Sequence, residues 1–117
     1  MKHINLDNRF FTTESNSDNG EVSSDTTFHY RQSGDLIHAE YAGGDIVKGH
    51  LLGKLIDDSR LEFVYHHLNK AGEIMTGKCT SYPEQTEDGR LRLKEYWQWT
   101  CRDFSSGESM LVETHRE

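Results

Sequence analysis

The segment from Leu91 to Thr100, LRLKEYWQWT, alternates between two kinds of side chain. Its odd-numbered residues are apolar with one exception, and its even-numbered residues are polar apart from Tyr96. Strict alternation at period two is typical of a β-strand with one buried face. The exception is Glu95, and a carboxylate on a buried face needs a hydrogen-bonding partner, water or a raised pKa. This segment therefore predicts a β-sheet core and supplies the first candidate for a functional residue.

Turn-forming sequences divide the rest of the chain into segments of strand length. They fall at residues 18–20, 33–35, 43–45, 57–59, 70–72, 88–89 and 105–107. Loops this short join antiparallel strands, because a parallel connection needs a dozen or more residues. The chain therefore predicts a single all-β domain over residues 1–117, an antiparallel up-and-down meander of about eight strands. The first strand is expected near Arg9 to Glu14.

The register between neighbouring strands can be predicted, since a slip of one residue turns every side chain to the opposite face. A two-residue turn at Ser33-Gly34 pairs Phe28 with Ala39 and His29 with His38. A three-residue loop at 43–45 leaves the lysines of the next strand in water, whereas a two-residue turn would bury them at high cost. The inner face then carries Thr26, Phe28, Tyr30, Ile37, Ala39, Tyr41, Val47, Gly49, Leu51, Gly53, Leu55, Leu61, Phe63, Tyr65, His67, Met75, Gly77, Cys79 and Ser81.

Three glycines of this inner face lie opposite rings in the predicted register. The pairs are Gly49 with His67, Gly53 with Phe63, and Gly77 with Tyr65. A ring fills the gap that a strand glycine leaves and allows a small sheet to bend. An eight-stranded meander removes its edges by closing into a barrel, whose interior accommodates side chains or one small ligand. The alternative is an open, strongly curled sheet that dimerises.

Charge and composition exclude several classes of partner. The net charge is −7, and the 13 Lys and Arg residues are scattered among 20 acidic ones, which disfavours nucleic-acid binding. We find no apolar segment long enough for a signal peptide or a membrane span, so we expect a cytoplasmic protein without a membrane partner. Cys79 and Cys101 are too few for a disulfide framework. No cofactor is predicted.

The ionisable and aromatic residues of the inner face suggest a small-molecule site. Such pockets are mostly apolar and aromatic, with a few convergent polar groups. The candidate ligand-binding residues are Tyr41, Tyr65, His67, Glu95, Trp97 and Trp99. The structural alternative is a carboxylate bonded to Tyr or Ser hydroxyls, with both tryptophans packed in the core. The acidic segments 14–25 and 84–88 are expected to be solvated loops.

The same residues allow other chemistries. Glu95 with His67 or Tyr65 is a candidate pair for general acid–base catalysis. Cys79 shares the inner face with His67, which leaves a Cys-His pair as a further alternative. Histidines with a glutamate are expected on the outer face, but without the spacing of a known metal motif, so no metal site is predicted.

Three segments resemble a small bacterial family. They are EVSSDTTFHYRQSGDLIHAEYAGGDIVKGHLLGKL, HHLNKAGEIMTGKC and LRLKEYWQWT, and the resemblance extends from about Asn8 to Glu113. Members of that family often carry the name N-acetylglutamate synthase. The usual acetyl-CoA transferases hold the pyrophosphate at a glycine-rich loop before a helix N-terminus, whereas Gly43-Gly44 is expected in a hairpin. In architecture, the chain also resembles avidin and lipocalin barrels, without a motif that transfers a ligand site.

Three functions fit these patterns. The first is binding of a small organic ligand inside the barrel. The second is a small enzyme that uses Glu95 with His67 or Tyr65, including the N-acetylglutamate synthase of the family's name. The third is a filled barrel that acts through its outer face, as a homodimer or an interaction module, with Phe10, Phe11, Val64 and Tyr96 as contact candidates. A cavity beside Glu95 would separate the first two from the third.

Overall fold

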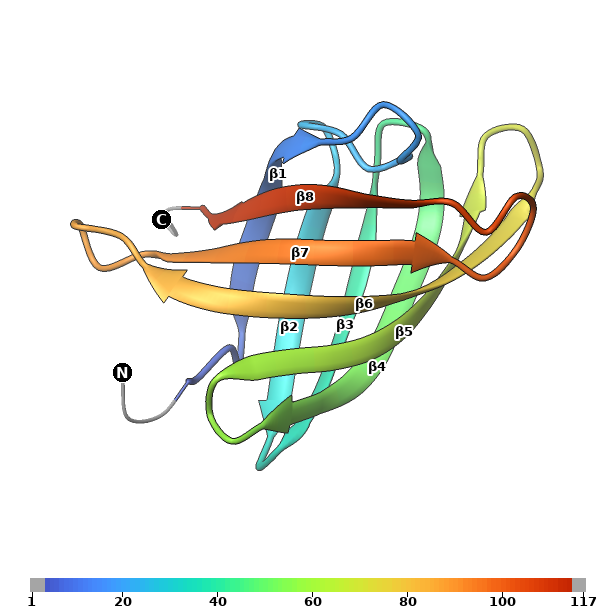
Figure 1. Cartoon of the computed structure of the whole chain (residues 1–117). Helices are drawn as coiled ribbons and strands as arrows, with labels where there is room; N and C mark the ends of the chain where they lie inside the picture. The colour runs from blue at the N-terminus through green and yellow to red at the C-terminus, as the bar shows by residue number, and fades with distance from the viewer. Residues whose placement is uncertain (1–3, 115–117) are drawn as a thin grey trace.

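Each strand of the computed structural model pairs with the strands before and after it in the sequence, and the first pairs with the last (Figure 1). The structure describes residues 4–114. The strands are β1 (Arg9–Asn16), β2 (Thr27–Ser33), β3 (Leu36–Gly43), β4 (Ile46–Ile56), β5 (Arg60–Asn69), β6 (Ile74–Gln85), β7 (Leu91–Trp99) and β8 (Ser106–Glu113). The predicted all-β class and the closed antiparallel meander are confirmed.

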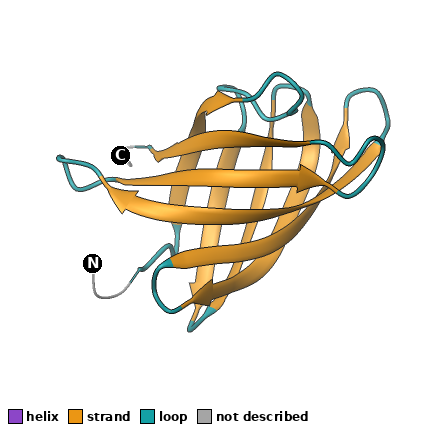
Figure 2. Cartoon of the chain, in the orientation of Figure 1, coloured by secondary structure: helices purple, strands orange, loops and turns teal. Residues whose placement is uncertain are grey.

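The connections between the strands are turns and loops, as Figure 2 shows. No helix of residues 4–114 is long and apolar enough to cross a membrane.

Strand β7 has the two faces that its sequence predicts. Its odd-numbered residues, Glu95 included, are buried, while Tyr96 on the other face is 44% exposed. Burial of each large apolar side chain contributes about 1.5–3 kcal/mol to folding. The strand therefore forms part of the core along its whole length and carries the carboxylate of Glu95 into it.

The register of β4, β5 and β6 is the predicted one. The pairs Gly49 with His67, Gly53 with Phe63, and Gly77 with Tyr65 are all present. A Cβ at Gly77 would overlap the Tyr65 ring, and a Cβ at Gly49 would overlap the Tyr41 ring, which comes from β3. The absent side chains therefore make room for rings inside the barrel.

The predicted register between β2 and β3 is wrong by two residues. The turn is Gly34-Asp35, so Phe28 pairs with Tyr41 and His29 with Glu40. Gly34 has a φ of 62° and stands first in the turn, where a type II′ hairpin requires glycine. Because the error is an even number of residues, the inner face of both strands is the predicted one.

Three residues, Ile46, Val47 and Phe11, lie on the opposite face from the one expected. The pairing of β3 with β4 shifts by one residue next to Gly43, and this bulge reverses the direction of the first side chains of β4. Ile46 is therefore buried, and Val47 is 52% exposed. Phe11 is fully buried rather than on the outer face, whereas its neighbour Phe10 stacks on His29 with ring centroids 4.2 Å apart. Phe11 is therefore removed from the candidate contact surface.

The end of the barrel beside the N-terminus is filled by side chains. Ile4 and Leu6 are buried in the hydrophobic core. The Gln32 side chain holds this segment in place: its Oε1 accepts a hydrogen bond from the Leu6 amide at 2.8 Å, and its Nε2 donates to the Ile4 carbonyl at 3.1 Å. This plug leaves the opposite end of the barrel for a site.

Candidate functional site

A cavity lies toward the end of the barrel that the β1–β2 segment, residues 17–26, covers. Gly20, Glu21 and Val22 of this segment line it together with residues of the barrel wall. The cavity offers about 50 Å³ to the centres of water molecules, and about 450 Å³ of space free of protein atoms when its open mouth is included. A single water centre needs roughly 10–15 Å³, so the cavity holds more than one water.

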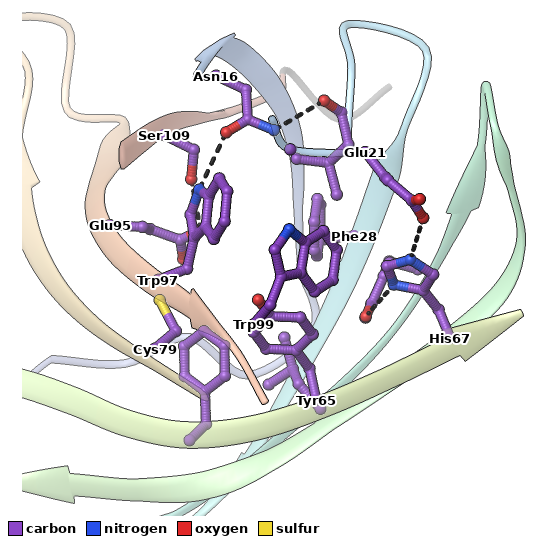
Figure 3. Close-up of a pocket in the computed structure, with 15 residues that line it drawn as sticks. Asn16, Glu21, Phe28, Tyr65, His67, Cys79, Glu95, Trp97, Trp99 and Ser109 are labelled. Atoms are coloured by element: carbon purple, nitrogen blue, oxygen red, sulfur yellow. Dashed lines mark hydrogen bonds and ion pairs between the residues drawn. The ribbon is translucent and has the colours of Figure 1, made fainter. Parts of the chain in front are cut away.

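All six residues predicted to bind a ligand line this one cavity. They are Tyr41, Tyr65, His67, Glu95, Trp97 and Trp99. Figure 3 shows Glu95, Ser109 and Trp97 on one wall and His67 on the opposite wall. The structure thus brings these side chains together, and their role toward a ligand stays a prediction.

Glu95 is a buried carboxylate with one unpartnered oxygen. The side chain is between Ser81 of β6 and Ser109 of β8 in the strand pairing. The Ser109 hydroxyl donates to Oε1 at 3.2 Å, whereas Oε2 and the Ser81 Oγ are buried and lack a hydrogen bond of regular geometry. Burial raises the pKa of Glu95 to about 7, and the two serine hydroxyls limit the rise. The carboxyl therefore titrates close to neutral pH.

The two tryptophans of β7 form an aromatic wall beside Glu95. Their ring centroids are 5.4 Å apart, and Trp99 also meets Tyr65 edge to face at 6.0 Å. The Trp97 indole N–H donates to Asn16 Oδ1 at 3.0 Å, and the Trp99 indole N–H donates to the Asn19 carbonyl at 3.0 Å. Both rings are therefore fixed by the end of β1 and the segment that follows it.

His67 connects the barrel wall to the β1–β2 segment. Its Nδ1 is hydrogen-bonded to the Tyr41 hydroxyl at 3.0 Å, and its Nε2 meets Glu21 Oε1 at 2.8 Å. The Asn69 amide donates to the same carboxylate at 3.2 Å. These contacts hold Glu21 at the mouth of the cavity and occupy both ring nitrogens of His67.

The proposed catalytic pairs are not directly connected. Across the described residues, Glu95 makes no hydrogen bond to His67 or Tyr65, although all three line the cavity. The acid–base hypothesis stays a prediction. Burial, with Glu95 as a further cause, raises the pKa of Cys79, so the thiol stays protonated at neutral pH. A protonated thiol is a poor nucleophile, which disfavours the Cys-His alternative.

Several lining residues had not been predicted as part of a site. Ser109 follows from the alternation of β8 once β8 is placed beside β7. Glu21 belongs to the acidic segment that was expected to be a solvated loop, and that expectation is wrong for this residue, whose side chain is only 24% exposed. Nothing in an aperiodic loop sequence signals such a contact, because the barrel mouth creates it.

One of three comparisons with known proteins found a match, and it agrees with this architecture. Searches among curated proteins and among solved structures each found no match. None of the comparisons supports an N-acetylglutamate synthase. The family model described as avidin-like protein matches residues 4–114, which is nearly the whole chain. On this match, and with its eight strands closed into a barrel, the chain belongs to the avidin-like protein family.

Proposed function

We propose that this protein binds a small organic molecule inside the barrel, in the cavity next to Glu95. The observation that carries the proposal is the Oε2 of this buried carboxylate, which lacks a regular hydrogen bond and lines a cavity where half of the other residues carry rings. Burying a carboxylate without a partner costs several kcal/mol by order of magnitude. A core that served only for packing would gain stability from an apolar residue at this position.

The form of the cavity also supports a binding role. Its walls combine aromatic rings with the few polar groups of Glu95, Ser109 and His67, as small-molecule sites do. The cavity favours interior binding over a filled barrel that acts through its surface. A homodimer stays a prediction, for which Val64 and Tyr96 are exposed on the outer face.

Thermal-shift screening against a metabolite library tests this proposal. A ligand at a hundred times its Kd stabilises the folded state by about 2.7 kcal/mol, which raises the Tm of a chain of this size by several degrees. We expect such shifts for the wild type and for Glu108→Gln, which makes the same substitution on an exposed residue of β8. Glu95→Gln should lose them. The proposal fails if no compound shifts the wild type, or if Glu95→Gln responds equally to every hit.

The two tryptophans allow the binding site to be located. The chain has only two, and both line the cavity. A ligand inside the barrel should therefore move both indole N–H signals in a ¹⁵N-correlated NMR spectrum. A hit that leaves both signals in place binds elsewhere and counts against the cavity.

A further inference from the structure

The charged groups that line the cavity include two carboxylates and no lysine or arginine among the described residues. Glu21 already has His67 and Asn69 as partners. Glu95 has the Ser109 hydroxyl on one oxygen, and near the other only the neutral hydroxyl of Ser81, without a hydrogen bond of regular geometry. The cavity therefore presents one carboxylate whose positive partner is missing, in a chain whose net charge is −7. Such a field attracts a cation and repels an anion.

The groups that face Glu95 from the surrounding strands do not supply that charge. Tyr30, Tyr41, Tyr65 and Cys79 come from β2, β3, β5 and β6, and burial raises the pKa of each, with Glu95 as a further cause. All four therefore stay neutral at pH 7. Ser81 and Ser109 contribute only hydroxyls.

The remaining imidazole of the cavity points to another partner. His67 from β5 places its Nε2 on Glu21, at the mouth rather than beside Glu95. No described basic side chain competes with a ligand for the carboxylate.

The shape and chemistry of the walls narrow the class of ligand. The faces of Trp and Tyr rings attract cations. A planar group with two parallel N–H donors matches the two oxygens of a carboxylate. Trp97 and Trp99 stand beside Glu95 on the same strand, and Ser81 lies opposite Glu95 on the neighbouring one. The empty space suits one small ring rather than a long or branched molecule.

We propose that the cavity takes a small flat organic cation, such as an amidinium or a protonated aminoheterocycle. Its N–H groups donate to Glu95, and its face packs on the indoles of Trp97 and Trp99. This inference rests on the proposed function and names the class of ligand for the same site.

Three probes of nearly equal shape and different charge test the inference: benzamidinium, benzamide and benzoate. Titration at pH 8, followed by tryptophan fluorescence and by the indole N–H signals, should give benzamidinium a Kd at least about tenfold lower than that of benzamide. Benzoate should not bind at the same concentrations. Glu95→Gln should weaken benzamidinium by about tenfold or more, and Glu108→Gln should leave its Kd unchanged.

The pH profile supplies a readout that a purely structural Glu95 would not produce. Because burial raises the pKa of Glu95 to about 7, a cation must displace its proton at lower pH. The affinity of wild type for benzamidinium should rise about tenfold between pH 6 and pH 8. Glu95→Gln should show a flat profile. If that variant does not fold, the wild-type profile and the order of the three probes decide the question.

The outcomes separate this inference from the proposed function. If benzamide or benzoate binds as tightly as benzamidinium or more tightly, as followed by the indole N–H signals, the ligand is not a cation. The proposal that the barrel binds a small molecule would still hold. The inference of a cationic ligand is also wrong if none of the three probes binds while the metabolite screen yields only neutral or anionic hits. Cationic hits in that screen, lost in Glu95→Gln, support the inference. If neither the probes nor the library bind, both the inference and the proposed function are wrong.

Discussion

The two ends of the barrel are closed by different chemistry. At one end Ile4 and Leu6 plug the interior and belong to the buried hydrophobic core. At the other end the closure is polar, made by the contact of Glu21 with His67, and a cavity lies beneath it. The plugged end buries apolar surface, which stabilises the fold, whereas the cavity keeps the buried carboxylate of Glu95, whose Oε2 lacks a regular hydrogen bond. The difference places an apolar plug at one end of the barrel and the proposed binding cavity toward the other.

The largest effect should come from the plugged end. Leu93 is fully buried in the core, so Leu93→Ala should lower the free energy of unfolding by about 3–4 kcal/mol through lost burial and a new void. Urea denaturation measures this loss. Leu52→Ala, at a position 47% exposed, is the matched control and should change stability by less than about 0.5 kcal/mol. A loss of similar size in both variants would remove the proposed contrast between core and surface.

The next effect belongs to the cavity end and depends on pH. The pKa of Glu95 is raised to about 7 from its ordinary value of 4.5, so the folded state holds the proton more tightly than the unfolded state. This contribution to stability is fully present below pH 4.5 and is lost as pH rises through 7. Wild type should therefore lose up to ~3 kcal/mol of stability relative to Glu95→Gln between pH 4 and pH 8. Parallel stability curves of the two proteins would contradict the burial of an unpaired carboxyl.

A smaller effect tests the packing of rings over glycine at the cavity end. A Cβ at Gly49 would overlap the Tyr41 ring, whose hydroxyl is hydrogen-bonded to His67. Gly49→Ala should cost about 2 kcal/mol, since a filled interior accommodates an added methyl group only by shifting its neighbours. Thermal unfolding, compared with Lys48→Ala at the adjacent exposed position, measures the difference. An unchanged Tm in Gly49→Ala would show that this end is loosely packed.

The smallest effect concerns the polar closure itself. Glu21→Gln removes the negative charge from the contact with His67, which is partly open to solvent, so stability should fall by about 1 kcal/mol or less. The Trp99 indole N–H signal should nevertheless move, because its acceptor, the Asn19 carbonyl, belongs to the same segment. Asp18→Asn, at an exposed position of that segment, is the control and should leave the signal in place. A loss as large as that of Leu93→Ala would mean that both ends stabilise the fold alike.

Much of the site could be predicted because a strand displays its two faces in its own sequence. The alternation of β7 places Glu95, Trp97 and Trp99 inside, and the register of β4 to β6 adds Tyr65 and His67. The error in the turn at Gly34 did not affect the predicted inner face, since a shift of two residues keeps every side chain on its face. It failed at Val47, where a bulge interrupts the period of two.

The sequence by itself therefore determined the strands, the inner face and the presence of one carboxylate on that face, because these follow from local periodicity and turn chemistry. Only the tertiary structure decided what surrounds that carboxylate. Closure of the barrel sets Ser109 beside Glu95, and the β1–β2 segment brings Glu21 to His67 across 46 positions of sequence. Contacts of this kind depend on how the barrel closes and how much space its side chains leave. The alternation of residues along a strand predicts neither.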